Sequence, residues 1–107
     1  MQILLHVLCT RGSSLRAEIV RDGSVKGFGL EVTEAKRPKR RPGWAKVHSS
    51  SGERGALNIE WHANSNTLTC RAVTRASRKT SVVVGNFVNY LLQKHRARIN
   101  AVLISQR

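Results

Sequence analysis

Apolar and polar residues alternate with a period of two along much of the chain, which is typical of β-strands. Residues 2–9 form an apolar run rich in branched side chains, and the turn-like residues 11–14 close it. This pattern predicts a buried first strand. Residues 15–21 place Leu15, Ala17 and Ile19 at every second position before the turn dipeptide Asp22-Gly23, so we expect a second strand there.

The next segments predict a weaker strand, a loop and a short strand. Residues 25–33 alternate less cleanly around two glycines, which favours a third strand with a bulge. Residues 35–43 hold five positive charges and two prolines, so they predict a flexible basic loop. Residues 44–48 fit a short strand, and the Ser/Gly-rich residues 49–55 fit a flexible connector.

Two alternating runs, residues 56–62 and 67–75, flank the polar residues 63–66 and predict an antiparallel hairpin. One face of this hairpin is apolar and consists of Leu57, Ile59, Trp61, Leu68, Cys70 and Ala72. The opposite face is polar and net positive and consists of Asn58, Glu60, His62, Thr69, Arg71, Val73 and Arg75. We therefore expect the first face to be buried and the second to be exposed.

The period then changes to that of a helix. Over residues 81–96 the apolar positions follow the i, i+3, i+4, i+7 rule, with Ser81 as the expected N-cap. An alternative is that the β-branched residues 82–85 form a strand and that the helix begins near Asn86. Residues 99–105 predict a final strand. The expected common core is Leu57, Ile59, Trp61, Leu68, Cys70, Phe87, Val88, Leu91 and Leu92.

These elements predict an α+β fold in which a mostly antiparallel sheet of about five to six strands is covered by one amphipathic helix near the C-terminus. At 107 residues the chain is long enough for one domain, residues 1–107, and too short for an enzyme with two lobes.

The charge of the chain points to an anionic partner. Nineteen Lys and Arg residues oppose six Asp and Glu residues, which gives a formal net charge of +13. No carboxylate follows Glu60, whereas residues 61–107 contain eight Lys and Arg residues. Internal ion pairs cannot neutralise that half, and a bound polyanion would relieve the repulsion.

The loop of residues 35–43 is the first candidate binding site. Its two prolines favour an extended chain, in which successive cations can follow the phosphates of a nucleic acid. An aromatic side chain directly after this track can stack on an unpaired base, although it can equally pack into the core. The candidate residues are Lys36, Arg37, Lys39, Arg40, Arg41 and Trp44.

The exposed face of the hairpin is the second candidate site. Alternation places Arg71 and Arg75 on one side about 13 Å apart, close to two phosphate spacings, and Arg78 and Lys79 extend this strip. A solvated sheet face is the alternative. The face carries no aromatic residue, which favours contacts with the nucleic-acid backbone over base recognition. The basic residues 94–98 are better explained by the dipole of the helix and by solubility.

Enzymatic and metal-binding interpretations find little support. The sequence contains no phosphate-binding loop, dinucleotide fingerprint or nucleophile elbow, so we expect no catalytic residue and no cofactor. His6 and Cys9 are three residues apart on one predicted strand, so they project to opposite faces and cannot share a metal. Cys9 and Cys70 are expected to be buried, reduced thiols.

The sequence therefore predicts a non-enzymatic domain that binds RNA or single-stranded DNA with weak sequence specificity. One alternative is an interaction module that docks on an acidic protein or a ribonucleoprotein, and a second is a small nuclease or another enzyme acting on a polyanion. Residues 1–9 lack a basic leader and are too short to span a bilayer, which favours a cytoplasmic protein without membrane contact. Residues 36–41 would also suit nuclear import in a eukaryote.

Overall fold

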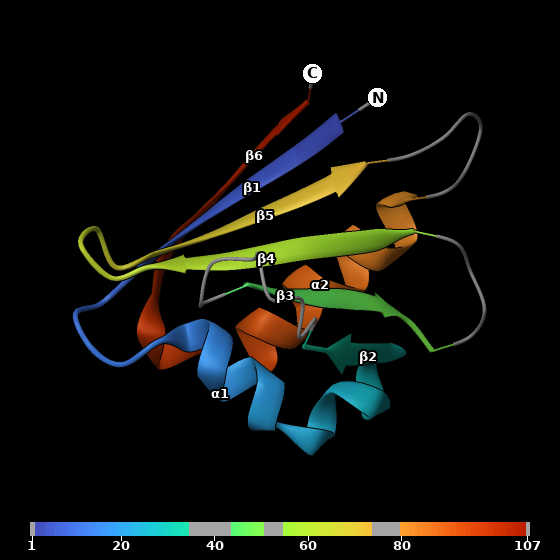
Figure 1. Cartoon of the computed structure of the whole chain (residues 1–107), viewed down its shortest axis with the longest axis horizontal. Coiled ribbons are helices and arrows are strands. Elements are labelled where there is room, and N and C mark those ends of the chain that lie inside the picture. Colours follow the sequence, from blue (N-terminus) through green and yellow to red (C-terminus); the bar gives the residue numbers. More distant parts are fainter. Residues whose placement is uncertain (1, 35–43, 51–54, 74–79, 107) are drawn as a thin grey trace.

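The computed structural model describes residues 2–34, 44–50, 55–73 and 80–106. A six-stranded antiparallel sheet forms one layer, with strand order β2-β3-β4-β5-β1-β6, and the helices pack against one of its faces (Figure 1). The elements in chain order are β1 (Gln2–Cys9), α1 (Leu15–Arg21), the 3₁₀ helix η1 (Gly23–Phe28), β2 (Leu30–Thr33), β3 (Trp44–Ser49), β4 (Ala56–His62), β5 (Thr67–Val73), α2 (Thr80–Lys94), the 3₁₀ turn η2 (Arg96–Arg98) and β6 (Ile99–Gln106). The predicted α+β class with an antiparallel sheet is confirmed.

The first strand lies inside the sheet, with its apolar side chains on the helix-covered face. β1 pairs with β5 on one side and with β6 on the other, both antiparallel. Ile3, Leu5, Val7 and Cys9 are buried at every second position, and the residues between them face the other way. This alternation confirms the predicted first strand, and β3 and β6 likewise confirm strands expected from the sequence.

The predicted hairpin is formed by β4 and β5, joined by a turn at residues 63–66. Asn66 closes this turn with a φ of 49°, a left-handed conformation that asparagine tolerates better than most residues. The predicted apolar face is buried, with Trp61 half-buried against the core. The hairpin is therefore confirmed in both its pairing and its orientation.

Helix α2 begins at Thr80, so the strand alternative for residues 82–85 is wrong and Ser81 lies within the helix instead of capping it. The face of α2 against the sheet is Val83, Val84, Phe87, Tyr90 and Leu91. Leu92, expected in the core, is 44% exposed. The buried face of α2 is therefore rotated relative to the predicted face, and it includes Tyr90 instead of Leu92.

The second predicted strand is wrong, because residues 15–21 form helix α1. The side chain of Ser14 accepts a hydrogen bond from the backbone N–H of Ala17 at 3.1 Å, which caps the helix. Leu15 and Ile19 are fully buried. These two residues are four apart, a spacing that one face of a helix and one face of a strand both satisfy, so seven residues could not distinguish the two periods.

The third predicted strand is correct only in its second half. Residues 23–28 form η1, and only β2 is extended. Gly29 joins them with a φ of +75°, a left-handed conformation that glycine adopts without strain, and its carbonyl accepts from the Ser50 N–H at 2.9 Å. Gly29 therefore marks a helix end and not a bulge, and Gly27 lies within η1.

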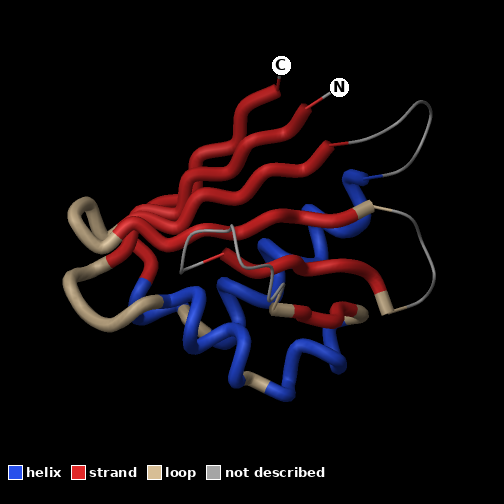
Figure 2. Tube along the Cα trace, viewed as in Figure 1, coloured by secondary structure: helices blue, strands red, loops and turns tan. Residues whose placement is uncertain are grey.

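Figure 2 shows that all helical segments lie together beside the lower strands of the view, and that the N- and C-terminal strands lie next to each other.

Ser49 belongs to β3, so the predicted connector begins one residue later than expected, and residues 51–54 lie outside the described part. None of the helices in the described ranges is long and apolar enough to cross a membrane.

Candidate nucleic-acid interface

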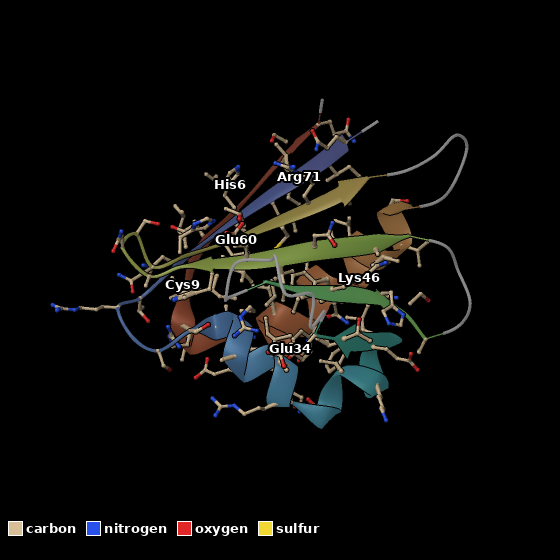
Figure 3. All side chains as sticks on the ribbon, in the orientation of Figure 1. His6, Cys9, Glu34, Lys46, Glu60 and Arg71 are labelled. Atoms are coloured by element: carbon tan, nitrogen blue, oxygen red, sulfur yellow. The ribbon has the colours of Figure 1, made fainter. Side chains whose placement is uncertain are left out.

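The face of the sheet opposite the helices carries the polar side chains of the strands. Residues directly opposite each other in an antiparallel sheet project to the same face. One row across this face joins Lys46 of β3, Asn58 of β4, Arg71 of β5 and Leu4 of β1 as successive partners. We call this side the open face. Figure 3 labels Lys46 and Arg71 on their separate strands.

The two cations of this row lie on either side of β4. Lys46 and Arg71 lie on strands that are two apart, and a strand spacing of 4.7–4.9 Å separates their backbones by about 10 Å. Both side chains are exposed, and neither forms an ion pair within the described residues. Both are therefore available to an external anion, with the Asn58 amide between them.

The neighbouring row adds polar groups and a negative charge. Glu60 of β4 lies opposite Thr69 of β5, which lies opposite His6 of β1. His62 Nε2 is 2.9 Å from the Thr69 hydroxyl, which fixes the imidazole against the face. Within the described part of the predicted basic hairpin face, Glu60 balances Arg71, so the net positive charge expected for that face does not arise there.

Most of the excess charge belongs to other segments of the chain. Ten of the 19 Lys and Arg residues, but only one of the six acidic residues, fall outside the described ranges. Those segments account for +9 of the formal charge of +13. In the described part, Arg16 pairs with Glu34 at 2.9 Å and Arg98 pairs with Glu18 at 3.0 Å, which removes two further cations.

The structure describes only part of the predicted site. Arg71 lies on the open face as expected, and the backbone of Trp44 begins β3 opposite Glu60. The other predicted residues lie outside the described ranges, and their role stays a prediction: Lys36, Arg37, Lys39, Arg40, Arg41, Arg75, Arg78 and Lys79. Sequence reasoning missed Lys46, although its position between the buried Ala45 and Val47 would have placed it on the same face.

The two predicted basic segments leave the sheet at opposite ends. Residues 35–43 connect Thr33 to Trp44, and Trp44 lies level with Glu60 near the end of β4. Residues 74–79 follow Val73, which lies opposite Gln2 at the beginning of β1. The row of Lys46 and Arg71 lies between these two exits. A linear anion along β4 and β5 would therefore pass the described cations on its way from one segment to the other.

Within the basic residues 94–98 at the end of α2, Arg98 has a structural role. Its guanidinium donates to Glu18 at 3.0 Å and to the carbonyl oxygen of Ser13 at 2.8 Å, and it contacts the hydroxyl of Thr10 at 3.3 Å. It also lies 6.0 Å from the centre of the Trp61 ring. Arg98 thus ties the β1–α1 connection to η2, a structural role that differs from the dipole and solubility roles expected for residues 94–98.

A second polar cluster joins η1 to the end of α2. The Tyr90 hydroxyl donates to Asp22 Oδ2 at 2.7 Å and lies 2.8 Å from His95 Nε2. Asp22 Oδ1 accepts from the backbone N–H and the hydroxyl of Ser24 at 2.9 and 2.6 Å. Asp22 and Tyr90 are 68 residues apart, so no local pattern could have revealed this contact.

The environment of this cluster shifts three pKa values. Burial raises the pKa of Asp22, but hydrogen bonds from Ser24 and Tyr90 outweigh it and leave that pKa below its ordinary value. Burial, reinforced by the Asp22 carboxylate, raises the pKa of Tyr90. Burial lowers the pKa of His95, although Asp22 acts in the opposite direction. With Tyr90 fully buried and held by both partners, the cluster fastens η1 to α2.

The cysteines and histidines form no metal site in the described parts of the chain. Cys9 and Cys70 are free and buried, as expected, and burial raises the pKa of both thiols. His6 and Cys9 lie on opposite faces of β1, which confirms the geometric argument from the sequence.

No protein-family model matches the chain, and neither the curated proteins nor the solved structures contain a match.

Proposed function

We propose that this protein binds single-stranded nucleic acid, RNA or DNA, through the phosphate backbone, with the strand lying along the open face of the sheet. The uneven distribution of charge carries the proposal. Residues 35–43 and 74–79 together hold +8, and Lys46 and Arg71, which form no ion pair within the described residues, lie between the two exits. A polyanion would reduce the repulsion among these charges, and phosphate neutralisation supplies most of the affinity of such proteins.

The composition of the open face supports weak sequence specificity. Base recognition on a sheet normally uses exposed aromatic side chains, on which bases stack. The described open-face residues of β4, β5 and β1 include no Phe, Tyr or Trp side chain, and they offer Asn58 and Thr69 as neutral hydrogen-bonding groups. Contacts of this kind position a sugar-phosphate backbone without distinguishing bases.

The test compares two double variants with the same change of charge. Lys46→Gln with Arg71→Gln removes the open-face pair, whereas Lys26→Gln with Lys94→Gln removes two exposed cations from η1 and α2 on the helical side. Fluorescence anisotropy with a labelled single strand of RNA or DNA measures both. We expect the first variant to bind more weakly and to flatten the slope of log K against log salt by about 1.4, at roughly 0.7 per phosphate contact. The second should resemble the wild type.

Three outcomes contradict this proposal in different ways. Equal losses in the two variants would mean that only total charge matters and that the open face is not the site. An absence of binding to any polynucleotide at low salt would exclude the function itself. If polyglutamate displaces RNA at equal charge concentration, the acidic-protein module described above becomes the better interpretation. Nucleic acid must first be removed from the purified protein with nuclease and high salt.

A further inference from the structure

Within the described part of the chain, the outer strand β6 pairs only with β1, so its other edge is unpaired and carries exposed apolar side chains. Among the large hydrophobic residues that the structure describes, Leu103 and Ile104 are the most exposed, at 55% each. They are neighbours, so one projects to the open face and the other to the helical face. All eight residues of β6 are uncharged in a chain of net charge +13. An apolar strand of this length at the edge of a sheet is a template for another strand.

The helical layer does not extend far enough to cover β6. Helix α1 packs mainly on β2, β3 and β4, and α2 mainly on β2, β4 and β5. Ile104 lies opposite Leu5 on the helical face, yet Leu5 is fully buried while Ile104 is not. In Figure 1, β6 lies beyond β1 at the margin of the sheet. The hydrophobic layer therefore ends on β6 with its last side chains uncovered.

The other edge of the sheet is protected. β2 has only four residues, carries Glu31 on its exposed side and is packed by η1. Short, charged edge strands resist pairing with another chain. β2 also matches the eight-residue β6 poorly in length, which disfavours head-to-tail growth of one molecule onto the next.

We propose that β6 pairs antiparallel with β6 of a second copy of this chain, so that two sheets join into one continuous sheet across a two-fold axis. Antiparallel pairing of a strand with itself is symmetric, and a closed dimer uses the same surface twice. The two free edges of the resulting sheet are then the two protected β2 strands.

In one register of the two β6 strands, Leu103 and Ile104 each lie opposite an apolar side chain of the other copy. With Leu103 opposite its own symmetry mate, Val102 lies opposite Ile104 of the other copy. Leu103 then pairs on the open face, while Ile104 extends the buried layer on the helical face. The polar ends also match, because Asn100 falls opposite Gln106. Residues 100–106 are then paired over their whole length.

The absence of charged residues on β6 favours a second β6 over a charged peptide from another protein. An acidic peptide would find no cation within β6, and a basic one would approach a strongly positive chain. A second β6 brings no charge to the edge, and Ser105, which falls opposite Ala101 in this register, is an exposed residue whose hydroxyl stays in contact with water. The remaining cost is the repulsion between two chains of +13, which salt screens.

The inference is tested by sedimentation equilibrium of the full chain, freed of nucleic acid, across concentration and salt. We expect a monomer–dimer equilibrium that tightens as salt rises from about 50 to 500 mM, opposite to the salt dependence of nucleic-acid binding. Leu103→Lys places two like charges opposite each other and should weaken the dimer at least tenfold. Leu92→Lys is the matched control, since it adds the same charge at a 44% exposed position on α2, and it should leave the dimer intact.

A second measurement does not depend on variants. Amide hydrogen exchange of the wild-type chain should slow in residues 100–106 as concentration rises, and not in β2. A chain that stays monomeric at high concentration and high salt overturns the inference, whatever its affinity for nucleic acid. So does a dimer that Leu103→Lys and Leu92→Lys affect equally, or one without added protection in β6.

Discussion

Two adjacent leucines of α2 have opposite surroundings. Leu91 is fully buried against the sheet, whereas Leu92 is 44% exposed. We expect Leu91→Ala to lower the free energy of unfolding by about 2–5 kcal/mol, because it removes buried methyl groups and leaves a cavity. Leu92→Ala should cost less than about 1 kcal/mol. Urea denaturation of both variants measures the difference, and similar costs would show that the helix presents another face.

The Tyr90 cluster makes stability depend on pH in a predictable direction. Since burial lowers the pKa of His95 in the folded chain, the unfolded chain takes up this proton first as the pH falls. The free energy of unfolding should therefore decrease as the pH falls below about 6.5, the ordinary value for histidine. His95→Gln should remove this part of the decrease, as thermal unfolding at a series of pH values would measure. A decrease unchanged in the variant would assign it to other groups.

The same cluster predicts the effect of removing one hydroxyl. Tyr90→Phe keeps the ring contacts with Phe28 and Phe87 but leaves Asp22 and His95 without their shared partner. We expect a loss of about 1–3 kcal/mol, as for a hydrogen bond to a charged group. Asp22→Asn in the Tyr90→Phe background provides the double-mutant cycle, and fully additive losses would mean that the two side chains do not interact.

At the scale of elements, α1 depends on its first turn. The Ser14 hydroxyl accepts from the Ala17 N–H, and the seven-residue helix is too short to persist without caps and packing. Ser14→Ala should lower the free energy of unfolding by about 1 kcal/mol. Ser13→Ala is the control, because among the described residues Ser13 is bonded through its backbone carbonyl, which accepts from Arg98. Equal effects in denaturant unfolding would rule out a specific capping contribution.

Elements whose hydrophobic period repeats several times were predictable from the sequence, whereas elements too short to repeat their period were not. β1 and the β4–β5 hairpin alternate over seven or eight residues, and the predicted pairing is correct. In α1, Leu15 and Ile19 fit both periods, and the decisive signal was the cap at Ser14, which sequence reasoning overlooked. For residues 82–84, packing of Val83 and Val84 against the sheet outweighs the β-preference of valine.

The residues of the candidate site were likewise predictable only where they lie on a strand with a clear period. Alternation in the hairpin placed Arg71 on the open face, and the same argument applied to β3 would have found Lys46 beside it. The cluster of Asp22, Tyr90 and His95 required the tertiary fold, because no sequence period connects η1 with the end of α2. Sequence alone therefore predicts which side of a strand a cation occupies, but not which cations become structural, as Arg98 does.

At the scale of the whole molecule, charge and fold are largely separate. The described part of the chain holds nine Lys and Arg residues against five acidic ones, and its core is built from apolar side chains. The basic residues of segment 35–43 have no carboxylate nearer in sequence than Glu34 and Glu53. Substitutions of charged residues away from packed contacts generally change stability by less than about 0.5 kcal/mol each. Binding and folding should therefore respond to different substitutions.

This separation gives a prediction for the segment itself. Changing Arg37, Lys39, Arg40 and Arg41 together to Ser should leave the melting temperature nearly unchanged while weakening the affinity for single-stranded RNA or DNA. If all four residues contact phosphates, the slope of log K against log salt should flatten by about 2.8, twice the effect of the Lys46 and Arg71 pair. Calorimetry and anisotropy on the same preparation measure both quantities. Intact affinity would confine binding to the open face and its Arg71, and unfolding would mean that these cations stabilise the domain.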